Sequence, residues 1–122
     1  MGSLPRPSDL ILAKRNYDVG RMSRERLDDL HDRAVQITID QLQSIGCQIV
    51  TDGEQSKPSC LTYPIFDSIG ADFKVYRRGF CLDRTHKDAF LIPRLIRAPF
   101  RYTTYAHRYL EVAKRFTDLP IK

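Results

Sequence analysis

The segment SRERLDDLHDRAVQITIDQLQSIGCQIVTDGE, residues 23–54, carries the pattern that decides the fold. Ser23 is a favourable helix N-cap, and Gly46 suits the left-handed residue that ends a helix. Between them apolar residues recur at steps of three to five, as in an amphipathic helix: Leu27, Leu30, Ala34, Ile37, Leu42 and Ile45. The segment Cys47-Gln48-Ile49-Val50 then predicts a short buried strand, and the polar residues 51–54 predict a turn.

A long helix, a glycine stop, a short strand and an acidic turn form one α-to-β step of an α/β protein. Active sites of such folds gather where strands end. Asp52 and Glu54 directly follow the predicted strand, so we expect both carboxylates to serve a site. The geometric expectation is that the strand through Val50 lies in a barrel-like sheet and aims the two acids into a cavity.

The flanking segments predict two further helices and a few short strands. Ser8 is placed to cap a helix over residues 9–18, which Gly20 ends. Thr104 is placed to cap a last helix, whose apolar side contains Tyr105, Tyr109, Val112, Ala113 and Phe116. In the middle, residues 73–76 and 80–82 are predicted to pair as a hairpin across 77–79, and residues 91–92 and 95–96 are strand candidates.

Size and composition predict one soluble domain. The chain has 122 residues, no apolar run long enough to span a membrane and no secretory signal, which favours a cytoplasmic location. Cys47, Cys60 and Cys81 are widely spaced and odd in number, so free thiols are expected. The net charge of +5 is compatible with an anion site or a solvated basic surface. Basic runs with interleaved aromatics are missing, so no nucleic-acid partner is predicted.

Three pieces of the chain together resemble the cobalamin-independent methionine synthase family. The first is the opening loop Gly2-Ser3-Leu4-Pro5-Arg6-Pro7, and the second is Gln41 with Gly46 and the turn Thr51-Asp52-Gly53-Glu54. The third is the closing segment Asp118-Leu119-Pro120-Ile121-Lys122, similar to the lead-in to a barrel strand. Their order and spacing cover nearly the whole chain. The resemblance implies an α/β fold that is part of a (β/α)8 TIM barrel, with three main helices and few short strands.

The resemblance also implies roles for individual residues. Gly2 and Ser3 would present backbone amides and a hydroxyl to the carboxylate of the substrate homocysteine, and Arg6 of the same loop is assigned to substrate binding. Glu54 would meet the substrate's ammonium group, with Asp52 supporting the same site. An unstructured terminal residue is the alternative interpretation of Ser3, and a helix-starting acid that of Glu54.

The family's methyl transfer from methyltetrahydrofolate to homocysteine requires zinc, whose ligands are a His-x-Cys pair, a Glu and a later Cys. This chain contains no His-x-Cys pair. Cys81 and His86 lack the tight paired spacing of zinc sites, so no metal site and no cofactor are predicted for this chain itself. We expect a truncated barrel whose strand edges are covered by a longer parent protein or by a second copy in a homodimer.

Two alternatives from other functional classes stay open. A stand-alone isomerase, lyase or cyclase could use Asp52, Glu54, His86 and His107 for acid–base catalysis on a small organic acid, in a pocket built by an oligomer. Individually, His86 and His107 fit surface positions better than catalytic ones, and His31 is expected to be solvated. A non-catalytic interaction module, docking through its exposed strand edges, is the other alternative.

Overall fold

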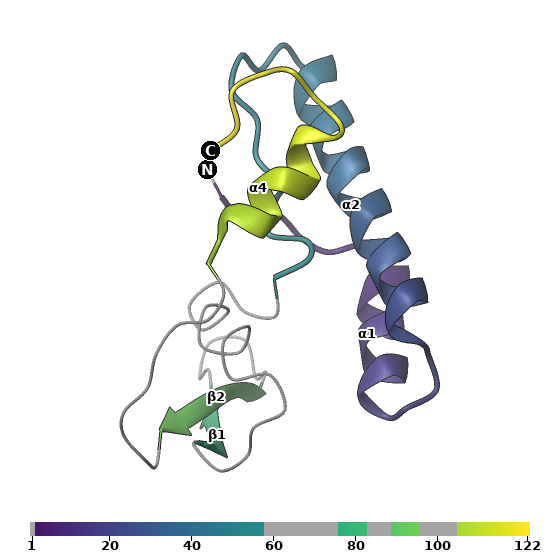
Figure 1. Ribbon diagram of the computed structural model, residues 1–122, viewed down its shortest axis with the longest axis vertical. Coiled ribbons are helices and arrows are strands. Elements are labelled where there is room, and N and C mark those ends of the chain that lie inside the picture. The colour runs from purple at the N-terminus through teal and green to yellow at the C-terminus, as the bar shows by residue number, and fades with distance from the viewer. Residues whose placement is uncertain (1, 58–75, 83–88, 96–104) are drawn as a thin grey trace. The chain divides into compact units, whose positions relative to one another are not determined.

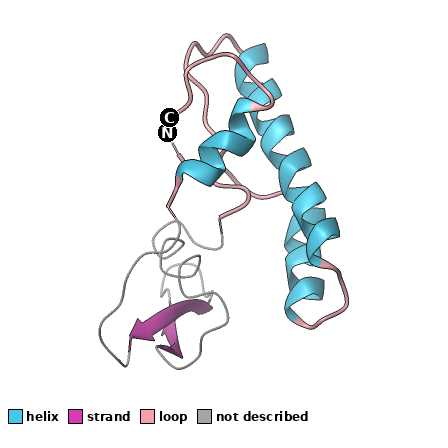
Figure 2. Ribbon diagram, viewed as in Figure 1, coloured by secondary structure: helices cyan, strands magenta, loops and turns pink. Residues whose placement is uncertain are grey.

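The computed structural model describes residues 2–57, 76–82, 89–95 and 105–122 (Figures 1 and 2). The chain packs as two compact units, Met1–Lys57 with His107–Lys122, and Pro58–Ala106, and each is described here by itself. Three helices lie in the described part of the chain, and all three belong to the first unit. None of the helices in these described ranges is both long and apolar enough to cross a membrane.

Helix α1 spans Ser8–Asp18, close to the predicted range. Ser8 is not its cap, because Pro7 occupies the N-cap position with extended backbone and its carbonyl accepts the Ile11 N–H at 3.1 Å. Gly20 ends the helix as predicted, at a φ of +72°. The amides of residues 20 and 21 bond back to the carbonyls of residues 17 and 16, which is the Schellman arrangement.

Helix α2 spans Arg24–Ser44 and confirms the central prediction from the sequence. The Ser23 hydroxyl accepts the Arg26 N–H at 3.3 Å, as an N-cap should. At the other end Gly46 has a φ of +84° and closes a second Schellman motif with Cys47, whose N–H donates to the Leu42 carbonyl.

The face of α2 that is buried differs in part from the predicted apolar stripe. Ile37 and Ile45 are exposed, although the periodicity placed them on the buried side. His31 is buried, with only 7% of its surface exposed, so the expectation that it is solvated was wrong. His31 lies between Leu27 and Ala34, the stretch of α2 that packs against α1, whereas α4 packs against the second half of α2. The buried residues are Leu27, His31, Ala34, Val35, Thr38, Ile39 and Leu42.

Helix α4 spans His107–Lys114 and starts later than expected. Tyr105 precedes it and is exposed rather than part of its apolar side. The proposed cap Thr104 lies outside the described residues. Tyr109 and Ala113 are buried, which confirms the predicted inward face at those two positions.

Two apolar clusters hold the first unit together. One lies between α1 and the first half of α2 and consists of Leu10, Ala13, Leu27 and Ala34. The other joins the second half of α2 to α4 and consists of Val35, Ile39, Leu42, Val50 and Ala113. Each fully buried aliphatic side chain contributes about 1.5–3 kcal/mol through its removal from water. Figure 1 shows the corresponding arrangement, with α1 and α4 against different parts of α2.

The segment after α2 and the segment after α4 meet side by side. Val50 and Ile121 form an isolated parallel β-bridge, in which the Val50 N–H donates to Pro120 and the Val50 carbonyl accepts the Lys122 N–H. The first unit therefore contains two helix-then-extended segments aligned in parallel, although the contact is one bridge and not a sheet. The larger barrel predicted from the resemblance stays a proposal.

The second unit contains one antiparallel pair, β1 (Tyr76–Leu82) and β2 (Ala89–Leu95). The predicted hairpin turn at 77–79 was wrong, because these residues lie within β1 and Gly79 is opposite Ile92. Glycine is compatible with both turns and extended chain, so its presence did not decide between them. Pro93 lies within β2, opposite Arg78, which an outer strand of a sheet can accept.

Buried His31 gives the first unit a specific pH dependence. Burial lowers the pKa of His31; contact with Asp28 raises it, and the charges of Lys14 and Arg24 lower it further. Since the folded-state pKa lies below the unfolded value of about 6.5, the unfolded chain binds more protons as the pH falls below neutrality. We therefore expect the free energy of unfolding to decrease as the pH is lowered through that window. This one group can contribute at most about 1.4 kcal/mol per pH unit.

Urea unfolding between pH 7.5 and pH 5.5, the window around a free histidine's pKa, would measure this slope. His31→Leu should flatten the slope, since it removes the titrating group from the same buried position. His107→Gln, a change at an exposed histidine, should leave it unchanged. An identical slope in wild type and His31→Leu would contradict the assignment.

Candidate functional site

The acidic turn after Val50 is shaped by its own side chains. The Thr51 hydroxyl accepts the Gly53 N–H at 3.2 Å, and Asp52 Oδ1 accepts the Glu54 N–H at 3.0 Å. These are the local bonds by which threonine and aspartate stabilise turns. Gly53 and Glu54 both have positive φ, +64° and +57°, and the Gln55 N–H closes the turn onto the Asp52 carbonyl at 3.3 Å. Glu54 is the only non-glycine residue with positive φ in the described ranges.

The opening loop is fastened to this turn. The Leu4 N–H donates to the Gly53 carbonyl at 3.0 Å. The Arg6 guanidinium donates to three backbone carbonyls of the turn, those of Gln55 at 3.2 Å, Glu54 at 3.0 Å and Lys57 at 2.7 Å. Arg6 and Gln55 are 49 positions apart in the chain, so these bonds bring together two of the segments that carry the resemblance.

Gln55 adds a buried polar group to the same junction. Its side chain is almost fully buried, and Nε2 lies 3.4 Å from the Leu4 carbonyl and 3.5 Å from the Pro5 carbonyl. Its Oε1 is buried without a hydrogen-bond partner in the described part of the chain. A side chain in this position fills the space between loop and turn and holds the two at a fixed separation.

The carboxylates of the turn share one cation. Lys57 Nζ lies 3.8 Å from Asp52 Oδ2 and 3.6 Å from Glu54 Oε1. The three side chains expose only 16% (Lys57), 7% (Asp52) and 18% (Glu54) of their surface, so solvent screens these charges less than it screens a surface pair. The Lys57 ammonium also lies 5.6 Å from the ring centroid of Tyr109, a buried residue of α4.

The structure brings together part of the predicted site. Asp52, Glu54 and Arg6 meet at the turn, with Arg6 bound to backbone carbonyls. Gly2 and Ser3 are exposed and directly precede Leu4, the residue bonded to Gly53. Asp52 is 5% exposed, and the barrel-like sheet and the cavity expected around the two acids stay predictions.

The two histidines of the acid–base alternative are not joined to this turn. His107 is exposed at the start of α4, and within the described ranges no hydrogen bond or ion pair links it to either acid. His86 lies outside the described residues, as do Cys60 and Thr104. The acid–base alternative therefore stays a prediction. In the described part of the chain, no histidine is bonded to Asp52 or Glu54.

Sequence reasoning missed Lys57, Gln55 and Tyr109. Lys57 follows Glu54 by three positions, a spacing that could have suggested an ion pair across the turn. Tyr109 was expected on an apolar helix face, but nothing in the local sequence connects it to Lys57. Gln55 carried no prediction from the sequence, and its burial depends on the distant opening loop.

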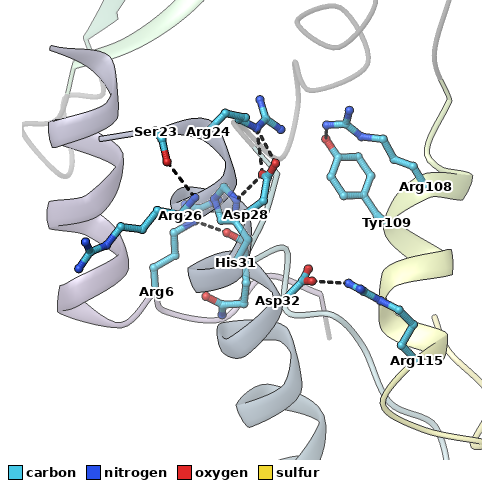
Figure 3. A network of polar contacts seen from close by, with 11 residues as sticks. Arg6, Ser23, Arg24, Arg26, Asp28, His31, Asp32, Arg108, Tyr109 and Arg115 are labelled. Carbon is cyan, nitrogen blue, oxygen red and sulfur yellow. Dashed lines mark hydrogen bonds and ion pairs between the residues drawn. The ribbon is translucent and has the colours of Figure 1, made fainter. Parts of the chain in front are cut away.

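Figure 3 draws Arg6 together with a second set of polar contacts that lies along α2 and α4. Arg24 pairs with Asp28 at 2.8 Å, and Asp28 lies 3.6 Å from His31 Nδ1. Asp32 pairs with Arg115, which links α2 to the end of α4. In the same view Arg108 donates to the Tyr109 hydroxyl at 2.9 Å. The Arg24–Asp28 pair is exposed and lies within α2, and the Asp32–Arg115 pair joins α2 to the residue after α4. Exposed pairs of this kind contribute little to stability.

Comparison with models of known protein families gives no match for this chain, and comparison with curated proteins gives none either.

The residues described do not fit the zinc site of the methionine synthase family. The sequence has no His-x-Cys pair, and the described ranges hold no group of three or more His, Cys, Asp or Glu side chains placed around a metal.

Proposed function

We propose that the chain is a segment of a methionine-synthase-like α/β barrel that binds a small amino acid, with homocysteine and methionine as the substrate class. The observation that carries the proposal is the junction of opening loop and acidic turn, fastened by the Leu4–Gly53 bond and the Arg6 guanidinium. The resemblance assigns the carboxylate of an amino acid to the opening loop and its ammonium group to the acidic turn.

Each end of a zwitterion has a chemically suitable partner at this junction. The acids of the turn, Asp52 and Glu54, are partly or fully buried and offer carboxylates to an ammonium group. Gly2 and Ser3 offer backbone N–H groups and a hydroxyl to a carboxylate, and clustered N–H groups form anion-binding concavities. The positive φ of Glu54 supports this assignment, since strained backbone at a non-glycine residue is concentrated at functional sites.

The proposed function is binding, and the ancestral methyl transfer is proposed only for the family to which the resemblance points. A homodimer that completes the site remains a proposal that rests on the barrel. The acid–base enzyme and the interaction module remain alternatives. The acid–base enzyme would use Asp52 and Glu54 of the same turn, and in the described ranges neither acid has a histidine bonded to it.

Isothermal titration of the full chain with L-methionine and L-homocysteine tests the proposal. We expect saturable binding with a Kd of about 1 mM or tighter. N-acetyl-L-methionine, which lacks the ammonium group, should bind at least tenfold more weakly, because a charge-assisted hydrogen bond contributes about 1.5–3 kcal/mol. Absence of saturable binding to either amino acid would remove this function.

Glu54→Gln provides the matched test of the ammonium contact. The substitution keeps the size of the side chain and removes its charge, so affinity for L-methionine should drop by about tenfold. Glu25→Gln, an exposed change in the first turn of α2, should bind as the wild type does. Equal affinity in all three proteins would show that Glu54 does not hold the ligand.

A further inference from the structure

Lys57 places its ammonium group near both carboxylates of the acidic turn. Lys57 Nζ lies 3.6 Å from Glu54 Oε1 and 3.8 Å from Asp52 Oδ2. Charge-assisted hydrogen bonds from ammonium to carboxylate are shorter, about 2.7–2.9 Å. Lys57 therefore neutralises part of the acidic charge without making close bonds to either of these two oxygens.

Asp52 gives a second and independent indication that a donor belongs here. Asp52 is 5% exposed, and its Oδ1 accepts the Glu54 N–H. Its Oδ2 is fully buried, faces Lys57, and has no hydrogen-bond donor within the described part of the chain. A buried carboxylate oxygen without a donor is uncommon in proteins and calls for an explanation.

We propose that Lys57 is a built-in competitor for the ammonium site: the amine of a bound amino acid displaces the Lys57 ammonium and donates to Asp52 Oδ2 and Glu54. This inference rests on the proposed function and adds the residue that sets its affinity. The Tyr109 ring, 5.6 Å from Nζ, is a cation–π partner near which the displaced ammonium can remain.

A tethered competitor has a predictable effect on affinity. A ligand that can bind only when Lys57 has left the acids has its apparent affinity reduced by the fraction of time the site is accessible. If the lysine occupies the acids for 90–99% of the time, as an ion pair held by a short tether can, the reduction is about 10- to 100-fold. Removal of the lysine charge should therefore raise the apparent affinity by the same factor.

The test is titration of Lys57→Met with L-methionine, 3-(methylthio)propylamine and N-acetyl-L-methionine. Both amine-bearing ligands should bind at least tenfold tighter than they bind wild type. The acetylated ligand, which cannot replace an ammonium, should not gain affinity. Lys57→Arg keeps a competing cation and should stay within about threefold of wild type. Lys114→Met, an exposed lysine of α4, is the matched control and should behave as wild type.

Lys57→Met leaves two largely buried carboxylates without their cation, so a measurement on the wild-type chain accompanies it. In protein labelled with ¹³C-lysine, L-methionine should shift the Lys57 Cε–Hε resonance, which is assigned by its loss in Lys57→Arg. An unchanged resonance at saturating ligand, or equal or weaker binding by a folded Lys57→Met, overturns the competitor role while leaving Glu54-dependent binding intact. If wild type, Lys57→Arg and Lys57→Met all fail to bind, the proposed function fails as well.

Discussion

Gly53→Ala should lower the free energy of unfolding by about 2–4 kcal/mol, the sum of a left-handed backbone and an overpacked contact. Gly53 has a φ of +64°, where an L side chain costs about 1–2 kcal/mol. A Cβ there would also lie 3.0 Å from Thr38 Cγ2 and 3.1 Å from Gln55 Nε2. Thr38 and Gln55 are both buried, and the β-branched threonine has little rotamer freedom with which to retreat.

Gly20→Ala is the control that separates the two causes. Gly20 has nearly the same φ, +72°, but a Cβ there has no atom within 4 Å. We therefore expect it to cost only the backbone strain, about 1 kcal/mol. Urea unfolding of both variants measures the difference. Equal losses would mean that the contact with α2 does not constrain the turn.

The steric part can also be relieved selectively. Thr38→Ser removes the Cγ2 methyl that lies 3.0 Å from the added Cβ. In a double-mutant cycle, Gly53→Ala should therefore be less costly in the Thr38→Ser background, by about 0.5–1 kcal/mol or more. Strict additivity of the two changes would contradict a direct contact between the turn and Thr38.

The parts of the fold that could be predicted are those set by local physics. Ser23 caps α2, and Gly20 and Gly46 end helices in left-handed conformation, because capping bonds form within a few residues. The acidic turn is local in the same way, since the amides of residues 53 and 54 donate to the side chains of Thr51 and Asp52 two positions earlier.

What could not be predicted depends on contacts between distant segments. His31 is polar in sequence but buried in the structure, and the span of α2 covered by α1 and α4 has no signature in the local periodicity. Arg6 was a candidate for substrate binding. In the structure its guanidinium donates to carbonyls of the turn and so fixes the opening loop to the turn.

The arrangement of Arg6 explains how an acidic turn can stay in a strained conformation. Glu54 and Gly53 both have positive φ, and the carbonyls of Glu54, Gln55 and Lys57 all accept from the Arg6 guanidinium. A planar guanidinium can donate to several carbonyls at once, which a single ammonium does less well. The opening loop thus supplies the stabilisation that the turn needs, and the turn in return holds Gly2 and Ser3 close to the acids' segment.

Arg6→Met should therefore destabilise the first unit by about 2–3 kcal/mol, since hydrogen bonds from a charged donor contribute about 1.5–3 kcal/mol each and these are only partly buried. Methionine keeps much of the apolar length of arginine and removes all three donated bonds. Arg6→Lys should recover less than half of the loss, because one ammonium cannot reproduce the fork. Urea unfolding measures both variants.

A local readout distinguishes loss of the fastening from general weakening. The Leu4 N–H donates to the Gly53 carbonyl beside the guanidinium, so its hydrogen exchange should accelerate in Arg6→Met more than that of amides in the middle of α2. Arg26→Met, at an exposed arginine whose side chain makes none of these contacts, should change neither quantity. Uniform acceleration of all amides in Arg6→Met would mean that the guanidinium stabilises the whole unit and does not specifically hold the loop on the turn.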